Sequence, residues 1–131
     1  MVDNFTEFLE KRKIAARAFC KGDPSKILEL SAEGDAATLF DHAGCVAIGA
    51  QEVHAASRQG AAKYGPNGYT RFQVLDKQVC GELAFWTALQ HAELEIDGTL
   101  QPVTIRMTEV FRFLDGSWKM VHRHASVPQA G

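Results

Sequence analysis

The chain has 131 residues, of which 46% are hydrophobic and 23% charged, as is typical of one globular domain. Its net charge of −2 gives no positive field of the kind that holds a nucleic-acid backbone. The chain is charged within its first three residues, no apolar run approaches the roughly 20 residues that span a membrane, and the three cysteines lack C-x-x-C spacing. We therefore expect a single domain over residues 1–131 of a cytoplasmic protein, with no signal peptide and neither membrane nor nucleic acid as a partner.

The first half of the chain has the apolar spacing of helices. Hydrophobic side chains recur at helical intervals from Phe5 to Phe19, which predicts a first helix. Asp23 and Pro24 then begin a short second helix. Residues 38–49 read as a short strand with a turn at 41–44, and residues 50–64 predict a third helix.

From Tyr69 onward the pattern changes to long β segments separated by turns. The predicted strands are 69–79, 82–96, 104–113 and 118–126. Asp97-Gly98 and Asp115-Gly116 are strong hairpin signals between such segments. Helices first and an antiparallel meander second predict the α+β class.

The end of the chain, TEVFRFLDGSWKMVHRHAS from Thr108 to Ser126, carries a family resemblance. It resembles the last hairpin of the nuclear transport factor 2-like superfamily, above all its SnoaL-like and ketosteroid-isomerase-like members. It is also similar to the association domain of calcium/calmodulin-dependent kinase II, where a DGxW turn precedes a His-x-His strand. The resemblance implies a cone of N-terminal helices packed on a curved, mostly antiparallel sheet, with a hydrophobic pocket in its open end and a homodimer formed through the sheet. It does not imply one chemistry, because this fold hosts isomerases, cyclases, dehydratases and non-enzymatic hubs.

Two registers are open for the last hairpin. A two-residue loop at Asp115-Gly116 would pair Glu109 with His122, so that these side chains share a face. A three-residue loop that includes Leu114 would shift the pairing by one residue.

We favour the three-residue loop, which pairs Thr108 with His122 and Arg106 with His124. It places the two histidines on one face with Arg106, Thr108 and Ser126. The opposite face then carries Met107, Glu109, Phe111, Val121 and Arg123.

Glu109 and Arg123 are the first catalytic candidates. Burial in an apolar cone would raise the pKa of the Glu109 carboxyl, and the guanidinium beside it would lower that pKa. Such a carboxylate could remove a proton next to a carbonyl group. The more ordinary interpretation is a salt bridge that fixes the sheet.

His122 and His124 form a His-x-His pair, which can serve a metal because residues i and i+2 on a strand point the same way. The sequence places no third ligand, so we expect no metal and instead interface histidines hydrogen-bonded to Thr108 or Ser126. Asp41 and His42 lie near the first strand, where ketosteroid-isomerase-like enzymes carry their base. The motif around them does not match, and an ordinary turn is the simpler interpretation.

We expect the ligand to contact aromatic side chains that form the pocket wall, together with residues on or beside the last hairpin. They are Tyr64, Phe85, Trp86, Thr87, Met107, Val121, His122 and His124. The kinase association domain carries pocket arginines at the positions of Thr87, Glu109 and Ala125. Their absence implies that its anion-binding cluster is not inherited.

The sequence thus predicts a small-molecule-binding protein. The leading hypothesis is acid–base chemistry of the isomerase, cyclase or dehydratase kind on a small apolar carbonyl compound, which requires no cofactor. The alternative is a non-catalytic ligand-binding or oligomerisation module.

Overall fold

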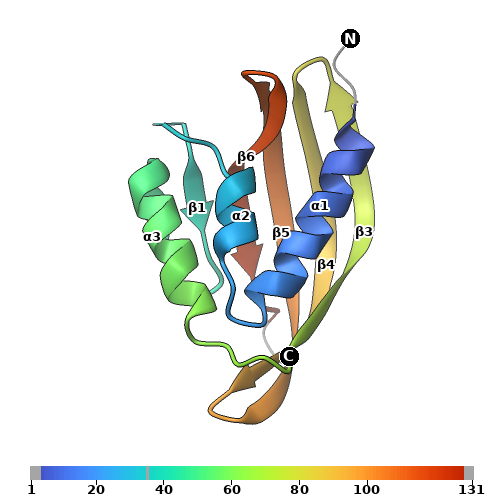
Figure 1. Ribbon diagram of the computed structural model, residues 1–131. Helices are drawn as coiled ribbons and strands as arrows, with labels where there is room; N and C mark the ends of the chain where they lie inside the picture. The colour runs from blue at the N-terminus through green and yellow to red at the C-terminus, as the bar shows by residue number, and fades with distance from the viewer. Residues whose placement is uncertain (1–3, 35, 129–131) are drawn as a thin grey trace.

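The computed structural model describes residues 4–34 and 36–128, and it has three helices on one face of a six-stranded sheet (Figure 1). The elements are α1 (Phe5–Phe19), α2 (Ser25–Leu30), β1 (Thr38–Phe40), β2 (Val46–Ile48), α3 (Ala50–Ala61), β3 (Tyr69–Cys80), β4 (Leu83–Ile96), β5 (Thr99–Leu114) and β6 (Ser117–Ser126). The strand order is β2-β1-β6-β5-β4-β3, and all neighbours are antiparallel except β1 and β6. The predicted α+β class, with N-terminal helices on a mostly antiparallel sheet, is confirmed.

The apolar face of α1 lies on the sheet and forms most of the core. Phe5 packs edge-on against Phe111 and Trp118, with ring centroids 5.4 and 5.0 Å apart, and Phe8 packs against Phe111 at 5.2 Å. These contacts join the start of the chain to its last hairpin. Within the part of the chain that the structure describes, no helix has the length and apolar character needed to cross a bilayer.

A second, smaller cluster lies under α3. It consists of Ala32, Ala37, Ala47, Val53 and Val121, with Leu39 and Ala56 packed against it. Small side chains dominate this cluster, so α3 packs against β1 and β2 without the aromatic packing found under α1. The site described below lies where the elements of the two clusters meet.

The last hairpin differs from the predicted register. Leu114 pairs with Ser117, so the loop is the two residues Asp115-Gly116, both with positive φ (52° and 86°) as a type I′ turn requires. The preferred three-residue loop is therefore wrong, and so are its pairs. A β-bulge leaves Val121 without a cross-strand partner, because Phe111 pairs with Met120 while Val110 pairs with His122.

The bulge shifts the pairing by one residue in the direction opposite to that expected from the longer loop, and either shift has the same effect on which side chains share a face. Beyond it, Glu109 pairs directly with Arg123, and Thr108 pairs with His124. Glu109 and Arg123 consequently share the face that carries the helices, while the histidines lie on the other face with Thr108. The predicted division of side chains between the two faces is right, although the predicted pairing is not.

The loop between α3 and β3 is hydrogen-bonded to the sheet at the lower end of the molecule in Figure 1. Glu95 accepts hydrogen bonds from the backbone N–H and the side-chain amide of Asn67, both at 3.0 Å. Gly68 has no room for a side chain, since a Cβ would lie 2.6 Å from the carbonyl oxygen of Cys20 and 2.9 Å from that of Glu93. Tyr64 lies within this loop, between the end of α3 and the anchored residues.

Candidate functional site

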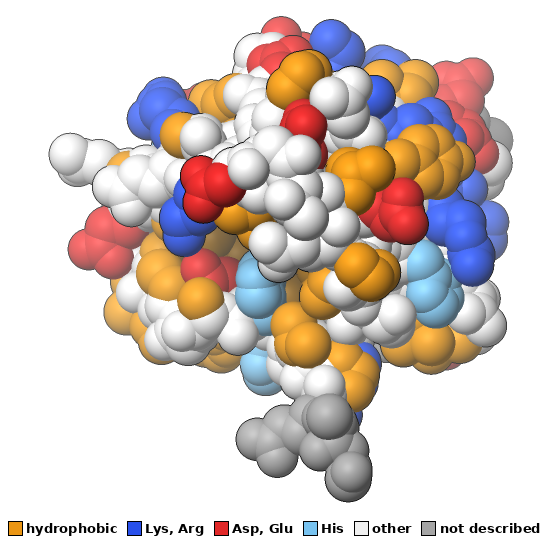
Figure 2. All heavy atoms as spheres, turned by 90° about the horizontal axis from the view of Figure 1, so that it is seen from below, with side chains coloured by type: hydrophobic (Ala, Val, Ile, Leu, Met, Phe, Trp, Pro, Cys, Tyr) orange, Lys and Arg blue, Asp and Glu red, His pale blue; other side chains and the backbone are white. Residues whose placement is uncertain are grey.

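A cavity of about 160 Å³ lies between α1, α3 and the helix-bearing face of the sheet. Its walls are largely apolar and include Ala16, Phe19, Leu39, Val53, Ile105 and Met120. The exposed residues that line it, His42, Ala43 and Lys63, mark its mouth at the lower end of the molecule. Figure 2 looks onto this end and shows a recess left of centre among hydrophobic, acidic and histidine side chains.

The inner end of the cavity carries two arginines held by one carboxylate. Arg12 of α1 is 4% exposed and donates from Nε to Glu109 Oε1 at 3.0 Å and from Nη2 to Oε2 at 2.7 Å. Arg123 of β6 donates from Nη1 to the same Oε2 at 2.6 Å, and the indole of Trp86 donates to Oε1 at 2.8 Å. Arg12 and Arg123 line the cavity, while Glu109, which is 0% exposed, lies outside its lining.

The Glu109 carboxylate is ionised despite its burial. Complete burial raises its pKa, but the charges of Arg12 and Arg123 and the hydrogen bonds from Arg12 and Trp86 outweigh burial and hold the pKa at about 2. Both carboxylate oxygens already accept two hydrogen bonds each. Glu109 is therefore a weak base at neutral pH, and its observed task is to hold the two guanidinium groups in place.

Arg123 extends the network from this carboxylate to β4. Its Nη2 donates to Oε1 of Gln90 at 3.0 Å, and the amide of Gln90 donates to Thr70 at 3.1 Å. Burial lowers the pKa of Arg123 and Glu109 raises it, yet a guanidinium stays protonated at neutral pH. With Arg12 also charged, the cluster of two arginines and one glutamate carries a net charge of +1.

Tyr64 and Asp41 bring polar groups to the outer part of the same cavity. Burial raises the pKa of the Tyr64 hydroxyl, with Arg123 lowering it and Cys20 and Asp41 raising it, so the phenol stays neutral and can donate a hydrogen bond. The Arg123 and Asp41 charges thus both act on this hydroxyl. Asp41 Oδ1 accepts hydrogen bonds from the backbone N–H groups of Ala43 (3.0 Å) and Cys45 (2.8 Å), which forms the predicted turn.

The structure brings only part of the predicted ligand-binding set together. Tyr64, Val121 and Arg123 line the cavity, and His122 borders it although its side chain lies on the other face of the sheet. Trp86 and Met107 are buried in the core outside that lining.

Phe85, Thr87 and His124 lie on the opposite face of the sheet, because side chains alternate along a strand and each shares its face with its cross-strand partner. Thr87 and His124 instead border an open hollow there.

Arg12 was missed by the sequence argument, although a signal for it exists. Its position falls between the buried pairs Phe8–Leu9 and Ala15–Ala16, on the apolar face of α1. A charged residue on such a face is expected to have a buried partner. The sequence could not say that the partner would be Glu109, which is 97 residues away.

The two histidines of β6 face β1 rather than the predicted partners. His122 Nδ1 lies 2.7 Å from Thr38 Oγ1 in a hydrogen bond, and the Phe40 ring packs edge-on against His122 and His124 at 4.9 and 5.3 Å. Burial and the neighbouring His124 lower the pKa of His122. Ser126, expected beside a histidine, accepts instead from Arg106 at 3.1 Å. Among the described residues no group of three His, Cys, Asp or Glu side chains is placed to hold a metal ion.

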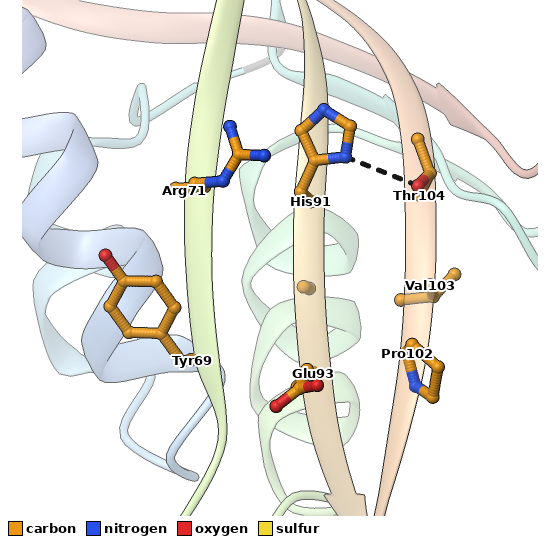
Figure 3. A pocket seen from close by; sticks show the side chains of 8 residues that line it. Tyr69, Arg71, His91, Glu93, Pro102, Val103 and Thr104 are labelled. Carbon is orange, nitrogen blue, oxygen red and sulfur yellow. Dashed lines mark hydrogen bonds between the residues drawn. The ribbon is translucent and has the colours of Figure 1, made fainter.

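A second hollow lies on the outer face of β3, β4 and β5, away from the helices (Figure 3). His91 is at its centre and is bonded to its strand neighbours, with Nε2 2.9 Å from Gln73 Oε1 and Nδ1 3.4 Å from Thr104 Oγ1. Arg71 and Glu93 lie on its rim as exposed side chains. This hollow is open and gathers no buried charge, unlike the cavity under the helices.

Solved structures share this fold at low sequence identity. A nuclear transport factor 2-like superfamily protein from Salmonella enterica has a TM-score of 0.80 at 18% identity, covering 95% of this chain and 91% of its own. A proposed calcium/calmodulin-dependent protein kinase type II association domain from Thiobacillus denitrificans has a TM-score of 0.75 at 20% identity, covering 91% and 92%. A proposed dehydratase of the same superfamily from Streptomyces avermitilis has a TM-score of 0.73 at 21% identity, covering 95% of each chain.

No curated protein sequence matches the chain. The sequence model of the SnoaL-like domain matches residues 14–130, which include the last six residues of α1 and the whole sheet. The predicted resemblance is therefore confirmed, and the chain belongs to the SnoaL-like domain family.

Proposed function

We propose that this protein binds a small, largely apolar molecule in the cavity, with an oxygen atom of that molecule resting against Arg123. The observation that carries the proposal is an apolar cavity that ends on a partly buried guanidinium. At about 160 Å³ the cavity is smaller than the roughly 300 Å³ at which drug-sized ligand sites begin. The ligand is accordingly a compact one.

A bulky side chain introduced on α3 is expected to fill the cavity and abolish ligand binding. Ala56 lines the cavity, so Ala56→Phe places a ring where the ligand would lie. Hexanol, hexanamide and hexanoate serve as probes, and their binding is followed by chemical-shift changes of labelled protein. At least one probe is expected to shift the resonances of cavity residues such as Val121 and Tyr64 in the wild type and none in Ala56→Phe.

Ala62→Phe is the matched control, because Ala62 is exposed at the end of the same helix and does not line the cavity. It is expected to bind the probes as the wild type does. Binding that survives in Ala56→Phe, or a wild type that binds none of the three probes, would contradict the proposal.

Acid–base chemistry on a carbonyl compound is the second candidate function. It is favoured by the presence of Asp41, Tyr64 and Arg123 around one cavity. In this proposal Arg123 polarises the carbonyl oxygen and Asp41, whose Oδ2 is not used by the turn, exchanges the proton. Glu109, the base that the sequence suggested, acts as a positioning residue for Arg123.

We further propose that the protein forms a homodimer through the outer face of the sheet, as the family resemblance implies. The large apolar side chains of Tyr69, Leu75 and Leu83 are exposed on this face. Phe85 and Leu89 are half-buried there. Several exposed apolar side chains on one face of a sheet are typical of an interaction site. A location in the cytoplasm remains a prediction.

Sedimentation analysis tests the dimer. The expected mass is twice the 14.4 kDa of one chain for the wild type and one chain for Leu75→Glu. Ile14→Glu, at another exposed apolar position but on the helix side, is expected to remain dimeric. A monomeric wild type, or a Leu75→Glu variant that stays dimeric, would refute this arrangement.

A further inference from the structure

The charges at the inner end of the cavity do not balance. Two guanidinium groups, Arg12 and Arg123, share the single carboxylate of Glu109. Within residues 4–34 and 36–128, Glu109 is the one carboxylate that forms an ion pair with either arginine. We propose that the ligand supplies the missing negative charge: it is a monocarboxylate with a short apolar body. This inference rests on the proposed binding function and names the chemical class of the ligand.

The excess positive charge is located at Arg123 rather than at Arg12. Arg12 is bound to both oxygens of Glu109 in the two-point geometry that best satisfies a guanidinium. Arg123 reaches only Oε2 of that carboxylate, and its other bonds go to the neutral groups of Gln90 and Met107. Its side chain is 17% exposed, against 5% for Arg12, so it is the arginine that a ligand can reach.

The other charged groups of the cavity do not correct the imbalance. Asp41 directs Oδ1 at the backbone of its own turn and forms no ion pair with either arginine in the described structure. Lys63 and His42 are exposed at the mouth, and the former adds positive charge. A partly buried cation whose charge is only partly compensated is costly, and this cost is offset when an anion binds.

The single excess positive charge and the apolar lining of the cavity indicate which kind of anion fits. One excess charge matches one carboxylate, whereas a phosphate dianion would leave the cluster net negative. Beyond Arg123 the ligand meets Leu39, Ile105 and Val121, which suit a hydrocarbon body. A planar carboxylate also matches the forked donors of a guanidinium.

Two probes with the same carbon chain, one charged and one neutral, test the inference. Hexanoate and hexanamide have the same carbon chain, and their dissociation constants are measured by calorimetry at pH 7.5. The wild type is expected to bind hexanoate roughly tenfold to hundredfold more tightly than hexanamide, as charge-assisted hydrogen bonds require. Arg123→Gln, which leaves Arg12 and Glu109 as a neutral pair, is expected to remove this preference.

Arg106→Gln is the control, because Arg106 lies on the outer face and bonds to Ser126. It removes the same charge from the molecule and is expected to keep the preference for hexanoate. Equal wild-type affinities for the two probes would overturn the inference and leave the proposed binding function standing. Failure of both probes, together with hexanol, would remove the binding function itself. The comparison of hexanoate with hexanamide in the wild type tests the inference even where Arg123→Gln does not fold.

Discussion

Glu109→Gln is expected to lower the free energy of unfolding by about 3–5 kcal/mol, the cost of breaking a buried ion pair by removing one partner. The substitution leaves Arg12 and Arg123 within reach of one another with no negative charge between them. It also turns an amide N–H₂ toward groups that are themselves donors, so at least one hydrogen bond is lost. Equilibrium unfolding in urea, followed by tryptophan fluorescence and by circular dichroism, gives the change.

Glu93→Gln is the matched control for this measurement. Glu93 lies on β4 with its side chain exposed on the outer face, so the same change of charge is expected to alter stability by less than about 0.5 kcal/mol. A loss below about 1 kcal/mol in Glu109→Gln would show that the two arginines do not depend on this carboxylate. In that case the assignment of Glu109 as the residue that positions Arg123 would be wrong.

The class of the fold and several of its turns were predictable because their signals are local. Asp97-Gly98 and Asp115-Gly116 do form two-residue turns with positive φ, as Asp-Gly between β segments indicates. Helical periodicity likewise located α1 and α3. Each of these features is specified by residues that are neighbours in the chain, so no knowledge of tertiary contacts was needed.

The candidate site was harder to predict because it is assembled from distant segments. The bulge at Val121 has no sequence signal, and without it Glu109 would pair with His122 instead of Arg123. Alternation along β4 could have separated Trp86, which is buried, from Phe85 and Thr87, which face outward. Arg12 was visible as a charge on an apolar helix face, but its convergence with Arg123 on one carboxylate is a property of the folded chain.

We expect the free energy of unfolding to fall below pH 4.5, because the unfolded chain then takes up a proton at Glu109, whose carboxylate pairs with Arg12 and Arg123 in the folded protein. The pKa of Glu109 is about 2 in the folded protein, against an ordinary value of 4.5. A depressed carboxyl pKa stabilises the folded state above the unfolded value, and this stabilisation is lost as the pH falls through the folded pKa. The difference of about 2.5 pKa units corresponds to about 3 kcal/mol, which disappears between pH 4.5 and 2.

Comparison of the wild type with Glu109→Gln isolates this contribution from that of other acidic groups. Asp23 and Glu95 also have pKa values below their ordinary range, because they accept hydrogen bonds from Ser25 and Asn67. These groups are present in both proteins, so their effects cancel in the difference between the two free energies of unfolding. That difference, measured in urea from pH 7 down to pH 2.5, is expected to be constant above about pH 5 and to shrink steadily below it. The difference in free energy of unfolding could instead stay constant down to pH 2.5. Glu109 would then not titrate as an ordinary carboxyl in the unfolded chain, or Arg12 and Arg123 would not hold it ionised in the folded protein. Either result would contradict the account of the cavity's inner end as a carboxylate clamped between two cations.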